Sequence, residues 1–487
     1  MRAEMSRSGI VLLRAAWVSV RASLARAGLA SLLFISVASC ITGRDRPQGA
    51  DVGAHDGSAS RDGEAERHED QGKSDVLRLD QGPLPPSDFP CEGDPWIKTP
   101  KTDIRCASRY VLTVESGISV VPQVAIAVDG IRKVGIAYGD TRAAEEGQLH
   151  LVSFPAGSRQ LPNPTVLAGH QFERFGVRVA MVPRSIGGFH LAYLVMDAQG
   201  RKLNYSGWTG SGLPAPEFLS AEVGSKGSVD LVEAADGRVF VFYYAEAAHM
   251  VYVRIRPKGG GGVWSPAQEL DSDVEPSVVG AGQLAVVRHA GGGPAFALHF
   301  ASGQNSSPRF RRYDGNSGWS SKKTLDNKTH AGIAGQSIDL VITQTEHYAT
   351  YFAIPTGSVA AQLRLVTWAS ANDTPKISIL EQAIPVKAGD PRYEAALAVD
   401  SWGLLHLAVI LPSPKTSPGT SLGVLEYRRQ VLNGGQKTWI TDVVDDDVAS
   451  VETASHVALW VEPRGHPHIV YFNGRTKKLM YATRDDR

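Results

Sequence analysis

Seven polar residues in this 487-residue chain occupy comparable positions, each about six residues before a predicted turn and each followed by Val, Leu or Ala. They are Gln123, Arg178, Asp230, Gln283, Asp339, Glu394 and His456. Carboxylates, an arginine and a histidine brought together could hold a polar ligand or a cation. Without distances between the carboxylates, no pair can be assigned the acid and nucleophile roles of a glycosidase.

These residues recur because a two-strand signature recurs, seven times in all. The second strand of each copy carries a central residue, spaced about 50 to 60 residues from the next; these are Tyr138, Tyr193, Phe242, His299, Tyr351, Val409 and Tyr471. Repeats of this length built from short alternating strands are typical of a β-propeller. The sequence therefore predicts an all-β chain folded as seven four-stranded blades. Trp264, Trp319 and Trp439 are expected to pack as wedges between blades.

The last copy of the repeat ends one strand short. Its three strands run over 456–461, 468–472 and 478–483, whereas Tyr110–Val114 precedes the first copy with the alternation of a strand. Pairing this N-terminal strand with the last blade would close the ring and cover an exposed strand edge. The seven polar residues would then form a ring at one mouth of the central channel. Two interpretations of this polar ring stay open. It is a ligand site, or the strands begin with polar residues only because the channel is filled with water.

Loops that join second to third strands open on the same face and add Asp140, Asp197 and Glu246 to the candidate binding residues. Binding residues are often found on loops that a rigid scaffold holds in place. The sequence supports no catalytic residue, metal site or cofactor. Gly419, Ser421 and Gly423 match a hydrolase elbow only as a string, since a Pro-rich loop precedes them and a strand follows. The pair His466 and His468 is read as a feature of the repeat, because His190 and His406 recur at the position of His468.

The N-terminus resembles a bacterial lipoprotein signal. Arginines precede a short apolar stretch, which ends in Val37-Ala38-Ser39-Cys40. The resemblance implies a signal peptide over 1–39, lipidation of Cys40 and a lipid anchor in the bacterial outer membrane or at the cell surface; an ordinary secretory signal is the alternative. Residues 40–90, rich in Asp, Gly and Arg, are expected to form a disordered tether.

Residues 91–107 lead into the propeller, which is expected over 108–487. Cys91 and Cys106 fall in this lead-in, and in an oxidising compartment they are expected to form a disulfide; two free thiols are the alternative. Lys plus Arg and Asp plus Glu both number 50. A neutral chain without a basic stripe argues against a nucleic-acid partner.

The strand phrases His468-Ile469-Val470-Tyr471 and Leu479-Met480-Tyr481-Ala482 resemble those of sialidase-like (BNR-type) propellers. The resemblance covers roughly 108–487 and implies the fold only. The Ser-x-Asp-x-Gly-x-x-Trp turns of that family are missing, and its arginine cluster, tyrosine nucleophile and glutamate partner cannot be mapped onto this chain.

These observations favour a membrane-anchored, extracytoplasmic binding protein that uses the polar mouth and loops of a propeller. A glycan or an envelope protein is the expected partner. The alternatives are a glycoside hydrolase or polysaccharide lyase acting on extracellular carbohydrate, and a purely structural scaffold. A deep pocket with an acidic pair would favour the enzyme.

Overall fold

The computed structural model describes residues 108–116, 124–140, 147–170, 179–197, 200–210, 215–223, 228–259, 263–272, 283–289, 292–302, 305–313, 318–326, 337–355, 357–370, 372–385, 394–413, 423–448 and 456–485. The predictions made for residues 1–107, including Cys40, Cys91 and Cys106, lie outside this part of the chain. The described residues form strands and turns only. They include no helix of the length and apolarity needed to span a membrane.

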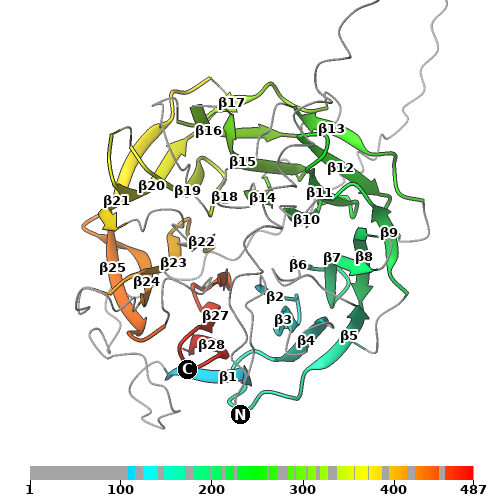
Figure 1. Ribbon diagram of the computed structural model, residues 1–487. Coiled ribbons are helices and arrows are strands. Elements are labelled where there is room, and N and C mark those ends of the chain that lie inside the picture. Colours follow the sequence, from blue (N-terminus) through cyan, green and yellow to red (C-terminus); the bar gives the residue numbers. More distant parts are fainter. Residues whose placement is uncertain are drawn as a thin grey trace, which may run out of the picture. The chain divides into compact units, whose positions relative to one another are not determined.

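Seven four-stranded antiparallel sheets are arranged around a central axis (Figure 1). Blade 1 holds β2 (Val124–Val128), β3 (Lys133–Asp140), β4 (Gly147–Pro155) and β5 (Thr165–His170); blade 2 holds β6 (Val179–Pro183), β7 (Phe189–Asp197), β8 (Gly200–Trp208) and β9 (Glu217–Ser220). Blade 3 holds β10 (Val229–Glu233), β11 (Val239–Ala245), β12 (Met250–Arg256) and β13 (Gln268–Asp271). Blade 4 holds β14 (Gln283–Arg288), β15 (Pro294–Ser302), β16 (Asn305–Arg312) and β17 (Lys323–Thr324).

The remaining blades follow the same order. Blade 5 holds β18 (Asp339–Ile342), β19 (His347–Ala353), β20 (Ala360–Trp368) and β21 (Lys376–Pro385); blade 6 holds β22 (Ala395–Val399), β23 (Leu405–Pro412), β24 (Gly423–Asn433) and β25 (Gln436–Asp445). Blade 7 holds β26 (Val457–Val461), β27 (Pro467–Asn473), β28 (Lys478–Asp485) and, as its outer strand, β1 (Ser108–Ser116). The prediction of a seven-bladed all-β propeller is confirmed.

The N-terminal strand closes the ring. In blade 7, β1 pairs antiparallel with β28, with Val111 opposite Ala482 and Leu112 opposite Tyr481. The first strand of each blade contacts the first strands of its two neighbours, and β2 of blade 1 contacts β26 of blade 7. The closure predicted from the alternation in Tyr110–Val114 is therefore confirmed, and β28 has a partner on both edges.

The hydrophobic core is divided into clusters that lie between neighbouring blades. One cluster joins Tyr138 and Phe154 of blade 1 to Tyr481 of blade 7. Tryptophans fill several of these spaces, as expected. Trp264 of blade 3 meets Tyr205 of blade 2 edge-on at 5.0 Å, and Trp319 of blade 4 meets Phe242 of blade 3 at 5.8 Å. Each fully buried side chain at a blade interface, such as Phe154, stabilises the fold by about 1.5–3 kcal/mol, so the blades depend on one another.

Candidate functional site

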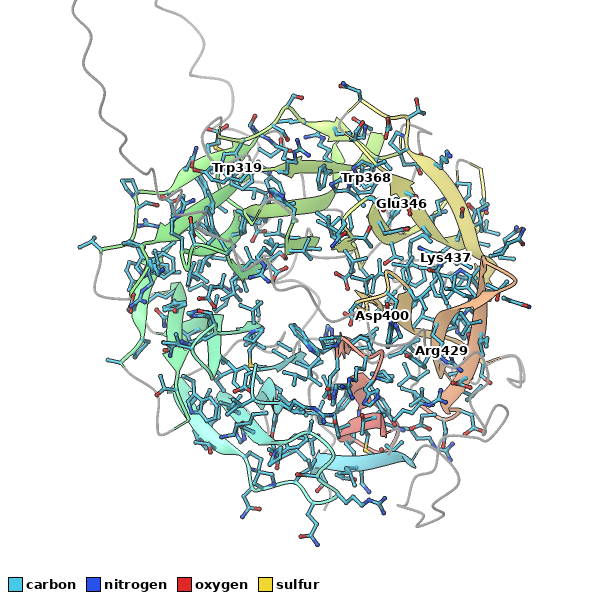
Figure 2. All side chains as sticks on the ribbon, turned by 180° about the vertical axis from the view of Figure 1, so that it is seen from behind. Trp319, Glu346, Trp368, Asp400, Arg429 and Lys437 are labelled. Carbon is cyan, nitrogen blue, oxygen red and sulfur yellow. The ribbon has the colours of Figure 1, made fainter. Side chains whose placement is uncertain are left out.

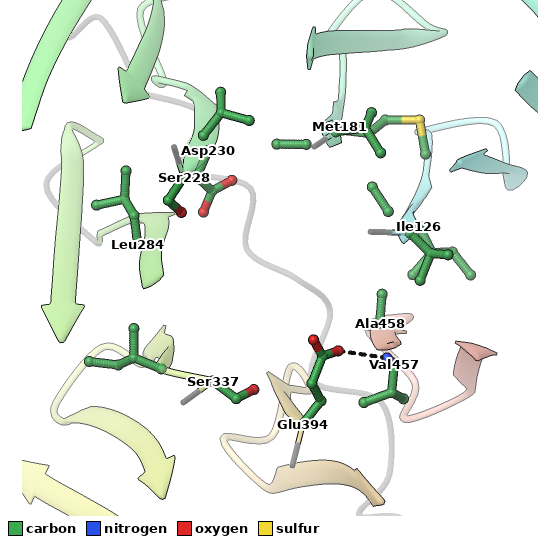
Figure 3. A pocket seen from close by; sticks show the side chains of 15 residues that line it. Ile126, Met181, Ser228, Asp230, Leu284, Ser337, Glu394, Val457 and Ala458 are labelled. Carbon is green, nitrogen blue, oxygen red and sulfur yellow. Dashed lines mark hydrogen bonds between the residues drawn. The ribbon is translucent and has the colours of Figure 1, made fainter. Parts of the chain in front are cut away.

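A cavity of about 230 Å³ opens where the first strands of the blades begin, at one mouth of the central channel (Figure 3). Residues from five first strands, including Ile126, Met181 and Leu284, surround it, but most of the surface that they expose to it is polar. Its polar lining comes from Ser228, Asp230, Ser337 and Glu394. In Figure 3, Ser228 and Asp230 lie on one side of the opening, with Ser337 and Glu394 across from them.

The structure brings part of the predicted ring together at this mouth. Asp230 and Glu394 line the cavity, and His456 precedes Val457, which also lines it. Gln123 and Arg178 fall outside the described residues, and Gln283 is described only as the first residue of β14. Their predicted roles stay predictions.

The ring is staggered, which the sequence alignment of the strands did not anticipate. Each first strand is followed by a turn, and the first residue of the turn donates its backbone N–H to a carbonyl three or four residues later. These first turn residues include Ala234, Thr343, Asp400 and Glu462. Counted from these turns, Ser228 and Ser337 stand where Glu394 and His456 stand in their strands. Asp230 and Asp339 lie two residues further along, on the same side of the strand because side chains alternate.

In blade 3 the stagger comes from the position of the turn: Asp230 lies six residues before Asp236, but the turn begins at Ala234, only four residues after Asp230. Val229 pairs with Tyr243, as Val124 pairs with Tyr138 in blade 1. Phe242, the residue used to align the repeat, is opposite Asp230 and is therefore one residue out of step. Counting six residues back from Ala234 and Thr343, where the turns begin in the structure, gives Ser228 and Ser337 as mouth residues.

The two buried aspartates link neighbouring blades. Asp230 accepts hydrogen bonds from the backbone N–H of Leu231, 2.8 Å, and from that of Val286 in blade 4, 2.7 Å. Asp339 does the same with Leu340, 2.8 Å, and with Leu397 in blade 6, 2.7 Å. Both carboxylates therefore satisfy backbone donors at the inner edge of the next blade, which favours the structural interpretation for these two members of the ring.

Burial governs the protonation of these aspartates. Removal from water raises the pKa of Asp230 to about 8; the two backbone N–H groups oppose this change, and the charge of Asp339 adds to it. Burial likewise raises the pKa of Asp339 to about 6, against the effect of its own two backbone donors. The inner channel thus holds a carboxyl group that is largely protonated at neutral pH.

Glu394 and His456 form the more accessible part of the mouth. Oε1 of Glu394 lies 2.5 Å from Nδ1 of His456, and Oε2 accepts a hydrogen bond of 3.0 Å from the backbone N–H of Val457 in blade 7 (Figure 3). Both side chains are 16% exposed, so they remain in contact with the cavity and solvent. Ser337 bonds to both the N–H and the C=O of Ala395 in the next blade, at 2.9 and 2.8 Å.

The predicted loop residues lie at the corresponding ends of other strands. Asp140 ends β3 and Asp197 ends β7, and their side chains are not described. Glu246 begins the tight turn between β11 and β12, where its carbonyl accepts from the N–H of His249 at 3.3 Å. Glu246 is partly buried.

The histidines that recur in the repeat are buried inside three blades. His190, His406 and His468 each place Nδ1 within 2.5–2.7 Å of a tyrosine hydroxyl on the adjacent third strand. On the other ring nitrogen, His406 meets Asp400 at 3.2 Å and His468 meets Glu462 at 2.9 Å. The interpretation of His468 as a repeat feature is supported, and no cluster of three or more His, Cys, Asp or Glu suited to a metal occurs in the described part of the chain.

No family model matches this sequence, and no curated protein matches it. Solved structures do match. A polysaccharide lyase, PL25 ulvan lyase, has a TM-score of 0.53 and 12% identity, over 77% of this chain and 94% of that one. The protein AofleA from Arthrobotrys oligospora has a TM-score of 0.43 and 11% identity, over 75% and 92% of the two chains. The Hadza microbial sialidase Hz136 has a TM-score of 0.41 and 10% identity, over 79% and 70%.

At these identities the comparisons concern the fold alone. The propeller fold that the strand phrases implied is confirmed at that level. The chain is a seven-bladed β-propeller similar in fold to a polysaccharide lyase.

Proposed function

We propose that this protein is an extracytoplasmic binding protein that holds a hydroxyl-rich group, such as a sugar residue of a glycan, at the mouth of its propeller. The observation that carries the proposal is the mouth cavity, whose exposed surface is mostly polar and includes the Glu394 carboxylate and two serines. Sugars carry many hydroxyl groups that donate and accept hydrogen bonds, and a polar surface of this kind can bind them.

The size of the cavity favours binding over processing of a polymer. Sites for small molecules usually enclose roughly 300–1,000 Å³, whereas this cavity measures about 230 Å³. It has room for one terminal or branching group rather than a polymer chain passing through. Glu394 can take part because an ionised carboxylate has about four acceptor positions, and one hydrogen bond and one ion pair occupy only some of them.

The charge of the mouth indicates which ligands fit. Among the described polar side chains that line the cavity, Glu394 supplies the negative charge, because Asp230 is buried and its pKa is raised to about 8. A carboxylate accepts hydrogen bonds from neutral hydroxyls and attracts cationic groups, but repels uronates and sulfate esters. We therefore propose a neutral or amino sugar for the mouth, with a peptide of an envelope protein as the competing partner.

The proposed location follows from the N-terminal residues. A lipid on Cys40 and a polar spacer over 40–90 would hold the propeller away from a bacterial outer membrane or cell surface, where glycans are abundant. Mass spectrometry of the mature protein tests this anchor, since an unmodified Cys40 rules it out. Labelling with a thiol reagent, with and without reduction, tests whether Cys91 and Cys106 are bridged.

An enzyme acting on extracellular polysaccharide is the second candidate, and one observation favours it. A carboxyl group with its pKa raised to about 8, as in Asp230, can serve as a general acid near neutral pH. The similar fold belongs to a lyase solved with -[GlcA(1-4)Rha3S]- bound. Against this candidate, both oxygens of Asp230 accept backbone hydrogen bonds, which fixes the group in the scaffold.

A glycan array probed with the whole mature protein tests the proposal. We expect binding to neutral or amino-sugar ligands that Glu394→Gln weakens about tenfold, the loss of one hydrogen bond to a charged group. Glu269→Gln, an exposed position on β13, is the matched control. Binding that Glu394→Gln leaves unchanged would exclude the mouth. Release of new reducing ends or unsaturated sugars from a polymer, abolished by Asp230→Asn, would establish the enzyme instead.

A further inference from the structure

The turns between first and second strands lie on the side of the propeller opposite the mouth, because each first strand begins at the mouth and ends at a turn. The third residue of each turn lies near its tip. In the described part of the chain, which leaves out the tip of blade 4, these residues are Ile131, Ile186, Asp236, Thr345, Trp402 and Arg464. Blades 3 and 5 therefore have polar tips. Blades 6, 7, 1 and 2, which are consecutive around the ring, have an aromatic, a basic and two apolar tips.

The tips of these four blades are accessible to a partner. Ile131 is 78% exposed and Ile186 is 79% exposed. Arg464 is also exposed, and Trp402 is partly exposed. Single exposed apolar residues are ordinary on a protein, but several that are held side by side mark an interaction surface. We call these four residues the turn surface.

Contacts between neighbouring turns hold the turn surface together. Each of the three blade boundaries that it crosses is bridged by a polar contact from one turn to the next. These contacts are Ser401 Oγ to the Pro463 carbonyl at 2.6 Å, Nε of Arg132 to Glu462 at 2.9 Å, and the Gly188 N–H to Asp129 at 3.1 Å. Trp402 also lies against the turn of blade 7, since a Cβ atom on Gly465 would be 3.6 Å from its ring. The four tips therefore form one rigid surface.

The carboxylates of these turns are buried and bind the turns from inside. Asp129 accepts hydrogen bonds from two backbone N–H groups of its own turn, at 3.1 and 2.8 Å. Asp400, labelled in Figure 2, accepts two from the turn that carries Trp402, both at 2.9 Å. Glu462 is likewise buried, in ion pairs with blade 1 and with a histidine of its own blade. The acids therefore shape the turns, while the side chains at the four tips carry no negative charge.

This combination of side chains suits the boundary between lipid and water. Isoleucine favours the acyl region, tryptophan is enriched at the level of the headgroups, and arginine is attracted to lipid phosphates. Burial of the three acids also removes carboxylates that an anionic membrane would repel. The turn surface therefore has the chemistry of a membrane contact.

The N-terminal part of the chain joins the propeller on the same side. β1 begins at Ser108, which pairs with Asp485 at the end of β28. β28 starts at the mouth side, where Lys478 pairs with Asn473 at the end of β27, and so it ends at the turn side. The residues before Ser108, among them the proposed lipid site Cys40, therefore join blade 7 on the side that carries the turn surface.

We propose that the turn surface docks on a lipid bilayer, with Ile131, Ile186 and Trp402 among the headgroups and Arg464 at the lipid phosphates. The inference rests on the envelope location in the proposed function. Docking leaves the mouth on the side away from the membrane, where it is open to a ligand. A second copy of the chain is the competing occupant of the same surface.

Fluorescence quenching on vesicles tests the docking. The mature chain from residue 40, with Cys40→Ser and an N-terminal histidine tag, is held by a nickel-chelating lipid on vesicles of phosphatidylethanolamine and phosphatidylglycerol. This tether makes the measurement independent of natural lipidation. Lipids with brominated acyl chains quench a tryptophan that lies in the bilayer interface. We expect quenching that Trp402→Phe abolishes, which assigns it to Trp402.

The other tips supply the matched variants. Ile131→Ser combined with Ile186→Ser should lower the docking equilibrium constant about tenfold, because each isoleucine enters the lipid only in part. Val359→Ser, which removes an 89% exposed apolar side chain from the mouth side, is the control and should change nothing. Arg464→Gln should weaken docking on vesicles with phosphatidylglycerol more than on vesicles of phosphatidylcholine.

Two results would overturn the proposal: Trp402 fluorescence that bromine leaves unchanged, and quenching that the double isoleucine variant retains in full. Sedimentation of the same protein without vesicles tests the competing occupant. Self-association that the double variant abolishes would show that the surface joins two copies of the chain instead. The glycan array and the mass spectrometry of Cys40 test the proposed function separately, so its failure is distinguished from a failure of docking.

Discussion

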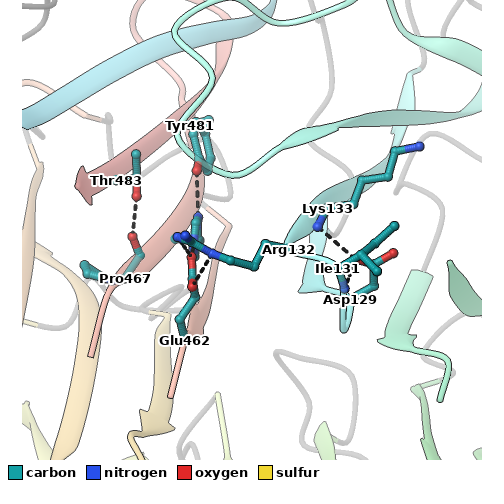
Figure 4. Close-up of polar contacts among 9 residues, drawn as sticks. Asp129, Ile131, Arg132, Lys133, Glu462, Pro467, Tyr481 and Thr483 are labelled. Atoms are coloured by element: carbon teal, nitrogen blue, oxygen red, sulfur yellow. Dashed lines mark hydrogen bonds and ion pairs between the residues drawn. The ribbon is translucent and has the colours of Figure 1, made fainter. Parts of the chain in front are cut away.

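Arg132 of blade 1 and Glu462 of blade 7 form a two-pronged ion pair across the boundary at which the ring closes (Figure 4). Nε of Arg132 lies 2.9 Å from Oε2 of Glu462, and Nη2 lies 2.9 Å from Oε1. Oε1 also meets His468 at 2.9 Å, and His468 meets the hydroxyl of Tyr481 at 2.7 Å. Tyr481 in turn pairs with Leu112 of the closing strand. One polar chain therefore connects blade 1 to the strands that complete blade 7.

Glu462→Gln should destabilise the protein more than loss of an ordinary surface ion pair. We expect a decrease of about 1–2 kcal/mol in the free energy of unfolding, because His468 and Arg132 both lose a charged partner while Arg132, at 60% exposed, recovers solvation. Arg475→Gln, which removes an exposed pair with Asp447, should cost less than about 0.5 kcal/mol. Denaturant unfolding measures both losses. Equal losses would show that the ion pair between Arg132 and Glu462 contributes no more to stability than an exposed ion pair.

Acid should destabilise the propeller in two steps. Burial lowers the pKa of His190, His406 and His468 below 6.5. For Glu462, burial opposes ionisation, but hydrogen bonds from His468 and Arg132 outweigh it and lower the pKa to about 2.

A group whose pKa is lowered in the folded state contributes stability above its unfolded pKa and loses it as pH falls. The melting temperature should therefore fall first below about pH 6.5, as the buried histidines resist protonation, and again below about pH 4.5, where carboxylates are protonated in the unfolded chain. Scanning calorimetry from pH 8 to pH 3 measures both steps. His468→Gln should reduce the first step; a variant that retains the full step would rule out His468 as a contributor.

The contribution of Asp230 to stability should change with pH in the opposite direction. Its pKa is raised to about 8 in the folded state, so its contribution to stability is full below the unfolded value of 3.8 and is lost as pH rises through about 8. In Asp230→Asn this loss should disappear, so that stability changes less between pH 5 and pH 9 than in the wild type. An absolute loss of stability is also expected, since an amide has only one acceptor oxygen for the two backbone donors. Asp236→Asn, at a half-exposed residue, is the control for the slope.

The architecture could be predicted from sequence because it rests on local, repeated signals. Continuous apolar runs around residues such as Tyr138 and Tyr471 mark strands that are buried on both faces, and the alternation in Tyr110–Val114 marks the closing strand. Because the strand pattern recurs seven times, a wrong strand assignment in one copy does not change the predicted architecture. The number of blades therefore did not depend on a single assignment, whereas the closure was predicted from Tyr110–Val114 alone.

The details of the site depend on register and on contacts between blades, which one strand does not encode. The turns of blades 3 and 5 begin at Ala234 and Thr343, two residues earlier than the alignment assumed, and this offset hid Ser228 and Ser337 from the ring. The pairing of His468 with Tyr481 was open to prediction, since His190 is accompanied by Tyr205 in the same way.

The central tyrosines of the repeat support a last prediction about how blades are joined. The Tyr471 hydroxyl of blade 7 donates to Asp445 of blade 6 at 2.9 Å, and both side chains are buried. Tyr351 of blade 5 donates to Asp326 of blade 4 at 2.5 Å. Tyr243, equally buried, has a hydroxyl with no hydrogen-bond partner in the described part of the chain.

Tyr471→Phe should therefore lower the free energy of unfolding by about 1–3 kcal/mol, because a buried carboxylate loses a donor. Tyr243→Phe removes the same atom from an equally buried ring and should be neutral or slightly stabilising, because no bond is lost and an unsatisfied hydroxyl is removed. Denaturant midpoints of the two variants give the comparison directly. If both substitutions cost the same, the loss reflects the packing of the ring, and the hydroxyl–carboxylate bond between blades contributes nothing measurable.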